Sequence, residues 1–399
     1  MRYGLIGGTL GHSYSPEIHK RLCGYDYELC PLAPEELPVF FARREFDGIN
    51  VTIPYKKEVI PYCGALSETA RRSGSVNTMI KQPDGSLFGD NTDLQGFQFM
   101  LQRAGIALRA KHVLIFGNGG SSQTVQLAAA DAGAKSVRVI GRNDSADCPQ
   151  AQVIVNTTPV GMFPHSSGCL VDLARYPRLE AAADLIYNPL RTRFLQQAEQ
   201  LGLITANGLS MLVAQAAASA ALFTGTQQSE CDVEHVLSEL QNNLQNWVLI
   251  GMPGCGKSTV GDWLAERSGR MFVDLDHEIE TRTGISPAEI ILRMGEKAFR
   301  DIESETAAEF GTKTGLVIAT GGGAVLREEN VRNLRQNGRL LWIQRGTAHL
   351  PANGRPLSVD LNTLLQKRAP AYEYAADAVI AHPENWDAVQ ENAWEVLTS

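Results

Sequence analysis

Short apolar runs alternate along the chain with stretches in which apolar residues recur at helical spacing. The runs are short enough for buried strands, and the stretches between them suit amphipathic helices. This alternation is typical of α/β folds with parallel sheets. The predicted strands form two series, the first at 5–6, 27–30, 48–53, 113–116, 137–140, 153–155 and 185–186, and the second at 248–250, 271–273, 316–319 and 340–343.

The stretch between the two series marks a boundary between two predicted units. Residues 233–244 combine Val and Leu with polar residues in a helix-like pattern, and Gln241 to Asn246 are mostly polar. We therefore predict one unit at 1–243 and a second at 246–399. Each is long enough to bury its own core.

The composition narrows the class of protein and of partner. Of the 399 residues, 44% are hydrophobic and 20% charged, and no apolar run reaches the roughly 20 residues of a membrane helix. Seven cysteines without a CxxC pair favour the reducing cytoplasm over a disulfide framework or a zinc site. The net charge of −8 argues against nucleic acid as a partner. Small-molecule substrates are expected, and an anionic one would need locally placed cations; the oligomeric state is not indicated.

A glycine-rich loop follows the predicted strand 248–250 and leads into a helical pattern. In a phosphate-binding loop, glycines let backbone N–H groups converge on the phosphates, and the helix N-terminus adds partial positive charge. Lys257 would reach the β- and γ-phosphates of ATP, and the Ser258 hydroxyl would ligate Mg²⁺. The predicted ATP-binding residues are Gly251, Gly254, Cys255, Gly256, Lys257, Ser258 and Thr259.

Two more elements of the second unit suit phosphoryl transfer. Asp274 and Asp276 follow the strand 271–273, so one can help to hold Mg²⁺ and the other can accept a proton from a hydroxyl. A glycine triplet follows the strand 316–319 and would let a ligand approach the backbone. The triplet consists of Gly321, Gly322 and Gly323.

With three further motifs, the second unit resembles shikimate kinases over almost its whole length. The motifs are Phe299-Arg300, Gly354-Arg355-Pro356-Leu357 and Lys367-Arg368-Ala-Pro-Ala-Tyr372. The resemblance implies a P-loop kinase with a parallel sheet, in which Asp276 orients the acceptor hydroxyl and acts as the base. It implies that Ser258 and Asp274 hold Mg²⁺, and that the glycine triplet lines the shikimate site.

The same resemblance assigns roles to three arginines. Arg300 and Arg368 would clamp the carboxylate of shikimate, which suits planar guanidinium groups. Arg355, from a lid, would neutralise the transferring phosphoryl group. Only Gln344 to Gly354 separate Arg355 from the preceding strand. This lid is shorter than is usual in the family, and we expect the difference to affect nucleotide affinity.

Polar motifs interrupt the apolar runs of the first unit. Because buried polar groups need partners, such motifs indicate a site. Ser13 and Ser15 precede a helical pattern, where their hydroxyl groups could hold a carboxylate or cap the helix. The other motifs are Asn50-Val-Thr52-Ile-Pro-Tyr-Lys56, Val76-Asn77-Thr78, Asn91-Thr-Asp93, Asn156-Thr157-Thr-Pro159-Val-Gly161-Met162, Tyr187-Asn188-Pro189 and Asn207-Gly208-Leu-Ser-Met211-Leu-Val-Ala-Gln215.

A dinucleotide-binding pattern begins at Val113. The strand 113–116 leads into Gly117-Asn118-Gly119-Gly120-Ser121-Ser122, an imperfect GxGxxG loop, and then a helix. The next strand ends in Gly141-Arg142-Asn143, and an Arg at this point fits the 2′-phosphate of NADP. Only Asp144 to Gln152 precede the strand 153–155, too few for a crossover helix of about 10–12 residues. We expect the strand 137–140 to be a sheet edge and NADP binding to be weakened, unless another surface, such as the second unit, covers this edge.

Together these motifs resemble shikimate dehydrogenases over most of residues 1–240. The resemblance implies a two-subdomain α/β fold, with a substrate subdomain at 1–96 and 207–243 and a trimmed Rossmann-like NADP subdomain at 97–206. Lys56 and Asp93 would form the catalytic pair, since the alkoxide left by hydride delivery needs a proton. The implied substrate contacts are Ser13, Ser15, Asn50, Thr52, Asn77, Tyr187 and Gln215. The implied NADP contacts are Gly117, Asn118, Gly119, Gly120, Ser121, Arg142, Asn143, Thr157 and Gly208.

The two resemblances imply consecutive reactions of chorismate biosynthesis. NADPH would reduce 3-dehydroshikimate to shikimate, and ATP with Mg²⁺ would convert shikimate to shikimate 3-phosphate. Three alternatives stay open: a first unit that is only a binding or scaffold module, a first unit that is an NAD-dependent quinate dehydrogenase, and a second unit that is a gluconate-type or nucleoside monophosphate kinase. The glycine triplet and the segment 367–372 disfavour the last of these.

Overall fold

The computed structural model describes residues 2–11, 13–346, 361–381 and 386–398. It divides into two compact units, one of Met1–Tyr187 and Thr192–Glu239, the other of Asn188–Arg191 and Leu240–Ser399. Each unit is an α/β structure built on parallel strands, as the hydrophobic pattern predicts. Among the described residues, no helix combines the length and apolar character that crossing a bilayer requires.

The polar stretch expected as a linker is mostly helical. Helix α8 (Glu230–Leu244) continues to within one residue of strand β12, which opens at Asn246. Asn246 is fully buried, and its amide group bonds to Lys313 O at 2.7 Å and to Leu316 N at 2.9 Å. The polar composition of this stretch therefore reflects a satisfied buried amide and an exposed helix face.

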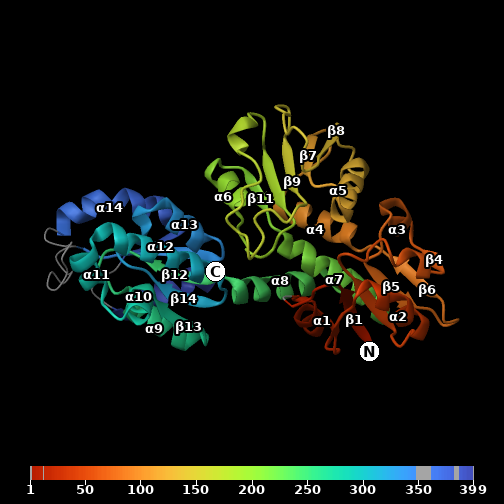
Figure 1. Cartoon of the computed structure of the whole chain (residues 1–399), viewed down its shortest axis with the longest axis horizontal. Coiled ribbons are helices and arrows are strands. Elements are labelled where there is room, and N and C mark those ends of the chain that lie inside the picture. Colours follow the sequence, from red (N-terminus) through yellow and green to blue (C-terminus); the bar gives the residue numbers. More distant parts are fainter. Residues whose placement is uncertain (1, 12, 347–360, 382–385, 399) are drawn as a thin grey trace. The chain divides into compact units, whose positions relative to one another are not determined.

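The first sheet of unit 1 has six strands in the order β2-β1-β3-β5-β6-β4. Strands β1, β2 and β3 are parallel, whereas β5 runs antiparallel to both β3 and β6. Leu37 and Phe41 pack in one cluster with Ile6 and Ile49. The helix that carries them lies beside the sheet (Figure 1). The strands are β1 (Tyr3–Gly7), β2 (Glu28–Pro31), β3 (Gly48–Val51), β4 (Ala65–Leu66), β5 (Thr78–Lys81) and β6 (Leu87–Asp90). The helices of this part are α1 (Ser15–Cys23), α2 (Leu37–Arg43), α3 (Glu68–Ser73) and α7 (Gly208–Thr224).

The second sheet of unit 1 has five parallel strands in the order β11-β10-β9-β7-β8. The strand predicted at 185–186 is wrong. The structure has a strand at Ala181–Asp184 instead, and its run of alanines gives no strand signal in the sequence. The strands are β7 (His112–Phe116), β8 (Ser136–Ile140), β9 (Val153–Asn156), β10 (Ala181–Asp184) and β11 (Ile204–Ala206). The helices are α4 (Asp93–Ala104), α5 (Gly120–Asp131) and α6 (Arg193–Gln200).

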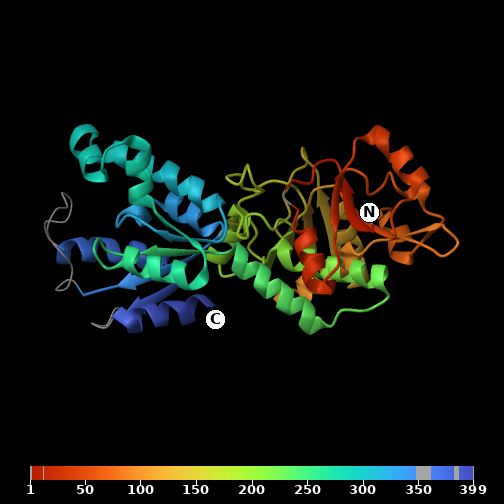
Figure 2. The ribbon, with the colours of Figure 1, turned by 90° about the horizontal axis from the view of Figure 1, so that it is seen from below.

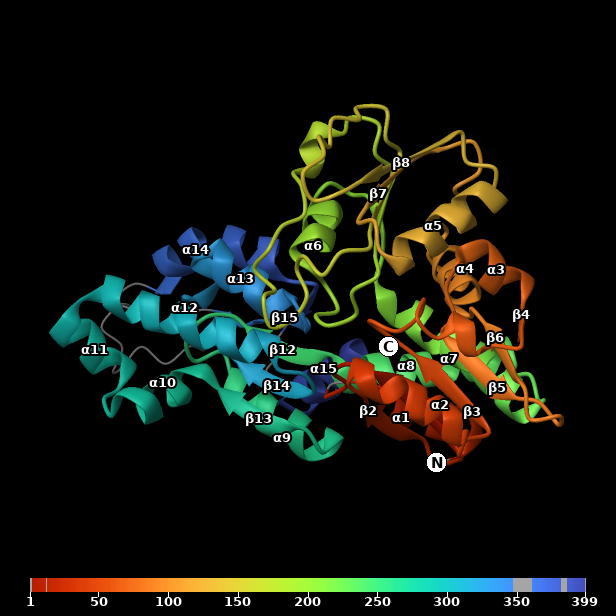
Figure 3. The same ribbon diagram turned by 45° about the vertical axis from the view of Figure 1, so that its right-hand side comes forward.

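Strand β8 is the edge of this sheet, which confirms the expected trimming. Residues 141–152, all of which the structure describes, contain neither helix nor strand (Figure 3). The segment packs on the sheet, because Cys148 and Ala151 are buried in the same cluster as Ile140 and Ile154. Arg138 donates to the carbonyl groups of residues 145 and 147. An irregular segment thus covers the face where a crossover helix would lie.

Unit 2 contains a parallel sheet in the order β13-β14-β12-β15-β16. Its core is formed by central strand residues such as Val248, Val317 and Leu341 together with Leu264 and Val389 from the surrounding helices. Helices lie on both faces of this sheet (Figure 2). The strands are β12 (Asn246–Ile250), β13 (Met271–Asp274), β14 (Leu316–Ala319), β15 (Gly338–Gln344) and β16 (Ala378–Ala381). The helices are α9 (Lys257–Ser268), α10 (Leu275–Thr283), α11 (Pro287–Met294), α12 (Glu296–Thr312), α13 (Glu328–Arg335), α14 (Leu361–Ala375) and α15 (Trp386–Thr398).

Candidate active sites

The first candidate site lies at the edge where β3 and β6 end and β5 begins. Because β5 is antiparallel to both neighbours, Asn77 at its start meets the residues that follow the other two strands. Lys56 comes from the turn after β3, and Asp93 is the first residue of α4. Lys56 Nζ lies 2.5 Å from Asp93 Oδ2, with side chains 19% and 9% exposed. The predicted pair is therefore a nearly buried ion pair.

Asn77 fixes the orientation of the Asp93 carboxylate. Asn77 Nδ2 donates to Asp93 Oδ1 at 2.9 Å, and Asn77 Oδ1 accepts from Thr92 N at 2.8 Å. Gln215 Oε1, from α7, lies 3.5 Å from Asn77 Nδ2. Four residues from different motifs thus meet around the Asp93 carboxylate: Lys56, Asn77, Thr92 and Gln215. All of them except Thr92 had been predicted as site residues.

Ser13 and Ser15 lie at the start of α1. The Ser15 amide donates to Ser13 Oγ at 3.3 Å. The segment after β1 is joined to the turn that carries Lys56, because Gly8 N donates to Ile53 O at 3.1 Å. The hydroxyl groups of both serines thus lie at the N-terminus of a helix, where the helix dipole favours the binding of a carboxylate.

Thr52 and Tyr187 complete the set of predicted substrate contacts. A Cβ at position 7 would lie 2.5 Å from the Thr52 methyl group, so Gly7 provides the space for this side chain. The rings of Tyr187 and Tyr14 lie 5.8 Å apart. Burial raises the pKa of Tyr187, so that its hydroxyl remains a hydrogen donor at neutral pH.

Asn50 faces the protein interior. Its Oδ1 accepts from Tyr27 OH at 2.7 Å, and its Nδ2 donates to Ser219 Oγ at 2.9 Å and Thr78 Oγ1 at 3.0 Å. Since the amide is buried and used within the protein, a positioning role fits Asn50 better than the predicted substrate contact.

The glycine loop after β7 has the geometry of a dinucleotide-binding turn. Gly117 has a φ of +107°, and a Cβ there would lie 2.4 Å from Thr157 Oγ1. Thr157 in turn donates to Phe116 O at 2.7 Å. Gly119 caps α5, whose first turn contains Gly120 and Ser121. The loop therefore presents the helix N-terminus to a ligand, with Asn118 beside it.

Arg142 and Asn143 are exposed after the end of β8. Asp144 Oδ2 accepts from Gly141 N at 2.7 Å and closes this turn. An acidic group at this point would suit the ribose hydroxyl groups of NAD, but the Asp144 carboxylate bonds to the backbone of its own turn. Gly208 is explained by packing, since a Cβ there would lie 2.0 Å from Leu185 O.

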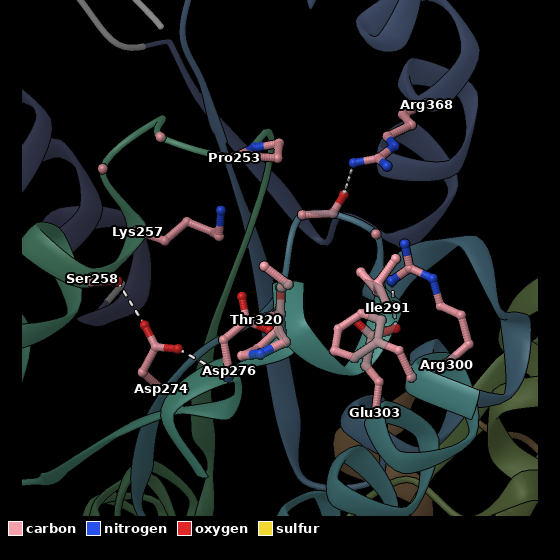
Figure 4. A pocket seen from close by; sticks show the side chains of 18 of the residues that line it. Pro253, Lys257, Ser258, Asp274, Asp276, Ile291, Arg300, Glu303, Thr320 and Arg368 are labelled. Carbon is pink, nitrogen blue, oxygen red and sulfur yellow. Dashed lines mark hydrogen bonds and ion pairs between the residues drawn. The ribbon is translucent and has the colours of Figure 1, made fainter. Parts of the chain in front are cut away.

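The second candidate site is a cavity of about 460 Å³ in unit 2 (Figure 4). The phosphate loop forms one wall between β12 and α9. Gly251, Gly254 and Gly256 all have positive φ, a conformation that favours glycine. Lys257 Nζ donates to the carbonyl groups of Gly251 and Met252, each at 3.0 Å. Of the other loop residues, Ser258 and Thr259 line the cavity and Cys255 is fully buried.

Ser258 and Asp274 can hold Mg²⁺. Ser258 Oγ donates to Asp274 Oδ2 at 2.7 Å, and Asp274 Oδ1 accepts from Asp276 N at 3.0 Å as the N-cap of α10 (Figure 4). A hydroxyl and a carboxylate are hard oxygen ligands, and in P-loop enzymes Mg²⁺ takes its remaining ligands from phosphates and water. Among the described residues, no group of three or more His, Cys, Asp or Glu side chains is arranged to hold a metal ion.

The glycine triplet makes room for charged side chains. A Cβ at position 321 would lie 2.8 Å from Asp276 Oδ1, and one at position 323 would lie 2.2 Å from Arg300 Nη2. Gly322 O accepts from Arg368 Nη1 at 2.9 Å. None of the three glycines has positive φ, so space explains them. The triplet thus brings Asp276, Arg300 and Arg368 to one side of the cavity.

Two further charged residues that line the cavity were not predicted. Glu303 Oε2 accepts from Arg300 Nη1 at 2.8 Å, and its side chain is 1% exposed. Burial raises the pKa of Glu303, although the Arg300 guanidinium opposes this. Its spacing of three from Arg300 on α12 was the available signal. Arg345, directly after β15, also lines the cavity. Arg355 lies outside the described residues.

Comparison with known proteins agrees with both sites. Residues 5–79 match the family described as "Shikimate dehydrogenase substrate binding domain", and residues 253–398 match "Shikimate kinase". The shikimate dehydrogenase (NADP(+)) of Clostridium perfringens is 30% identical over 271 residues, 60% of this chain and 98% of the relative. The chain belongs to the shikimate dehydrogenase family. Its C-terminal part is a shikimate kinase domain, so the chain is a bifunctional enzyme of the shikimate pathway.

Solved structures of the dehydrogenase family have the same fold as the first part of the chain. The shikimate 5-dehydrogenase of Thermus thermophilus, in complex with NADP(H) and shikimate, is 32% identical with a TM-score of 0.55, covering 60% of this chain and 99% of that one. A quinate dehydrogenase from Corynebacterium glutamicum, in complex with NAD, is 25% identical with a TM-score of 0.54, covering 60% and 98%. The fold therefore occurs with both cofactors.

Proposed function

We propose that this enzyme reduces 3-dehydroshikimate to shikimate with NADPH and then phosphorylates shikimate to shikimate 3-phosphate with ATP and Mg²⁺. The observation that carries the dehydrogenase assignment is the buried contact between Lys56 and Asp93, held by Asn77. The kinase assignment rests on Lys257, Ser258 and Asp274 sharing one cavity with Arg300 and Arg368.

In the dehydrogenase, the protein must supply a proton to the substrate oxygen. The nicotinamide cofactor supplies the hydride. Lys56, as an ammonium group, donates a proton to the oxygen that becomes the 3-hydroxyl group. Asp93 keeps Lys56 in place and compensates its charge. The hydroxyl groups of Ser13 and Ser15 at the start of α1 hold the substrate carboxylate, and Gln215 and Thr52 bind its hydroxyl groups.

We further propose NADP rather than NAD as the physiological cofactor. Arg142 is exposed after β8, where a guanidinium group can bind the 2′-phosphate. Asp144, the nearest acidic residue, bonds to the backbone of its own turn. The trimmed sheet edge leaves less protein beside the adenosine, so the affinity should be lower than in a dehydrogenase with the complete subdomain.

In the kinase, charge compensation by fixed groups lowers the barrier to phosphoryl transfer. ATP supplies the phosphoryl group, and Mg²⁺ would be held by Ser258 and Asp274. Asp276 accepts the proton of the shikimate hydroxyl group that attacks. Arg300 and Arg368 bind the shikimate carboxylate, and Lys257 neutralises the phosphates. Arg355 would add a further positive charge.

A second candidate function is an NAD-dependent quinate dehydrogenase in place of the shikimate enzyme. It is suggested by the similarity to the quinate dehydrogenase in complex with NAD. A first unit without catalysis, serving only as a scaffold, is disfavoured by the assembled Lys56–Asp93 pair.

A coupled assay on the purified full chain tests these proposals. Dehydroshikimate, NADPH and ATP with Mg²⁺ are supplied, and NADPH absorbance, shikimate and shikimate 3-phosphate are followed together. We expect NADPH oxidation without ATP, and shikimate 3-phosphate only with ATP. Reduction that prefers NADH, or that acts on 3-dehydroquinate instead of 3-dehydroshikimate, would support the quinate dehydrogenase instead of the shikimate enzyme. No reduction with either cofactor would support the scaffold.

A further inference from the structure

Ser219 of α7 makes buried contacts that the predicted site does not explain. Its side chain is fully buried. Four polar atoms, from β3, β5, the start of α4 and α7 itself, lie within 3.0 Å of its Oγ. They are Thr78 Oγ1 at 2.8 Å, Asn50 Nδ2 at 2.9 Å, Gln215 O at 2.9 Å and Thr92 Oγ1 at 3.0 Å.

The chemistry of these neighbours determines the direction of two of these hydrogen bonds. Gln215 O can only accept, so it takes the Ser219 hydrogen, and Asn50 Nδ2 can only donate to Ser219 Oγ. The Thr78 and Thr92 hydroxyl groups each lie within reach of both Ser219 Oγ and Asn77 Oδ1, Thr78 Oγ1 at 2.8 and 3.0 Å and Thr92 Oγ1 at 3.0 and 3.3 Å. With its hydrogen turned to either of these oxygens, Thr92 Oγ1 presents a lone pair to Asn77 Nδ2, 2.9 Å away.

The position of Thr92 Oγ1 matters for Asp93. Asn77 Nδ2 has two hydrogens, one bonded to Thr92 Oγ1 and the other to Asp93 Oδ1, each at 2.9 Å. An amide turned the other way would place its oxygen against the carboxylate, which is repulsive. The chain of bonds from Ser219 thus ends at the carboxylate that holds the Lys56 ammonium group.

We propose that Ser219 is a positioning residue of the dehydrogenase reaction, acting through Thr92 and Asn77 on the Asp93–Lys56 pair. The inference rests on the proposed dehydrogenase function and adds to it a residue outside the recognised motifs. Ser219 also ties α7, which carries Gln215, to β3 and β5 through Asn50 and Thr78. The substrate-binding helix and the catalytic pair therefore share one fixed point.

The simplest competing explanation is that Ser219 only bonds to the carbonyl group one turn earlier, as many helix serines do. Thr224 of the same helix provides the comparison. Thr224 Oγ1 donates to Ala220 O at 2.9 Å, and within the described parts of the chain its other bonds go to Thr226. A Thr224→Ala variant therefore loses the same local bond without touching the chain to Asp93.

The test compares Ser219→Ala with Thr224→Ala in the full-length enzyme. We expect Ser219→Ala to lower kcat for dehydroshikimate reduction by about tenfold, the effect of one misplaced hydrogen-bonded group. The KM for NADPH and the kinase rate of the same protein should stay at the wild-type values. Thr224→Ala should keep wild-type kcat. A Ser219→Ala variant with kcat within about twofold of wild type overturns the proposal.

A double-mutant cycle with Thr92→Val asks whether Ser219 acts through Thr92. Ser219→Ala should cost little in the Thr92→Val background, because the path is already broken. An equal cost in both backgrounds would overturn the proposal. If Ser219→Ala does not fold, Thr92→Val alone tests the proposal and must lower kcat. A Thr92→Val variant with the wild-type kcat would also overturn it. Absence of reduction by the wild-type enzyme would instead refute the proposed function itself.

Discussion

At the scale of single residues, proton transfer in the dehydrogenase depends on one ammonium group. Lys56 is the basic side chain bonded to Asp93 in this site, whereas the neighbouring Lys57 is exposed. Lys56→Ala should lower the rate of dehydroshikimate reduction by about 10²–10⁴-fold, the usual contribution of a general acid. NADPH oxidation measures this effect.

The control for this substitution is Lys57→Ala, which should keep wild-type reduction. Kinase activity should be unchanged in both variants. Reduction by Lys56→Ala at a rate near that of the wild type would remove Lys56 from the mechanism.

A second residue-scale prediction concerns Gly323 in the kinase. An added Cβ would lie 2.2 Å from Arg300 Nη2, so the guanidinium group must move. Gly323→Ala should raise the KM for shikimate by about tenfold or more, since a displaced clamp loses its bidentate geometry. Steady-state kinetics of the kinase measure the KM for shikimate, and the dehydrogenase rate of the same protein is the internal control. An unchanged KM would mean that Arg300 does not bind the substrate.

At the scale of elements, the end of β10 contains a buried carboxyl group. Asp184 accepts from Thr192 Oγ1 at 2.6 Å, Asn156 Nδ2 at 3.0 Å and Ile186 N at 3.0 Å. Burial nonetheless raises the pKa of Asp184 to about 7. A raised carboxyl pKa stabilises the fold below the unfolded value near pH 4, and this stabilisation is lost as pH rises through about 7.

Asp184→Asn should remove this pH dependence, because the amide stays neutral and can keep the three contacts. The free energy of unfolding of the variant, minus that of the wild type, should therefore rise by on the order of 1–4 kcal/mol when the pH is raised from 4 to 8. Urea unfolding curves at both pH values measure this difference, with the loss of dehydrogenase activity as the signal for unfolding. Parallel pH curves for the two proteins would show that Asp184 does not titrate in this range.

The edge strand β8 illustrates how an element can be lost without loss of the fold. The segment after it buries Cys148 and Ala151 on the sheet. Arg138 of β8 places a charged side chain on the edge and bonds to residues 145 and 147, which disfavours pairing with another chain. We expect the cost to fall on NADP affinity, because the proposed adenosine site would lie beside this edge.

At the scale of the whole molecule, the two reactions should be separable within one chain. Each unit contains its own sheet and core, and the proposed catalytic residues of each reaction belong to one unit. Lys257→Ala should lower kinase turnover by about 10²-fold or more, because the charge that stabilises the phosphates is lost. Dehydrogenase kinetics of the same variant should match the wild type.

The two activities of Lys257→Ala can be followed in a single coupled assay, where shikimate should accumulate. A parallel fall in both activities, with an unchanged thermal melt, would show that the two reactions are coupled.

Much of both sites was open to prediction from the sequence, because the chemistry is encoded locally. The phosphate loop needs glycines, a lysine and a hydroxyl at fixed spacing, and such spacing survives without any knowledge of the fold. The missing crossover helix followed from chain length alone, since residues 144–152 are too few to form one. These features depend on the covalent chain and its reach.

Other features were decided only by tertiary structure. The alanines of β10 carry no strand signal, and they form a strand because β9 and β11 pair with them on both sides. Asn50 looked like a substrate ligand, yet the packing of α7 against the sheet turns its amide inward to Ser219. Ser219 itself belongs to no recognised motif. Its proposed role exists because folding brings β3, β5, α4 and α7 to one buried oxygen, and sequence spacing carries no information about that meeting.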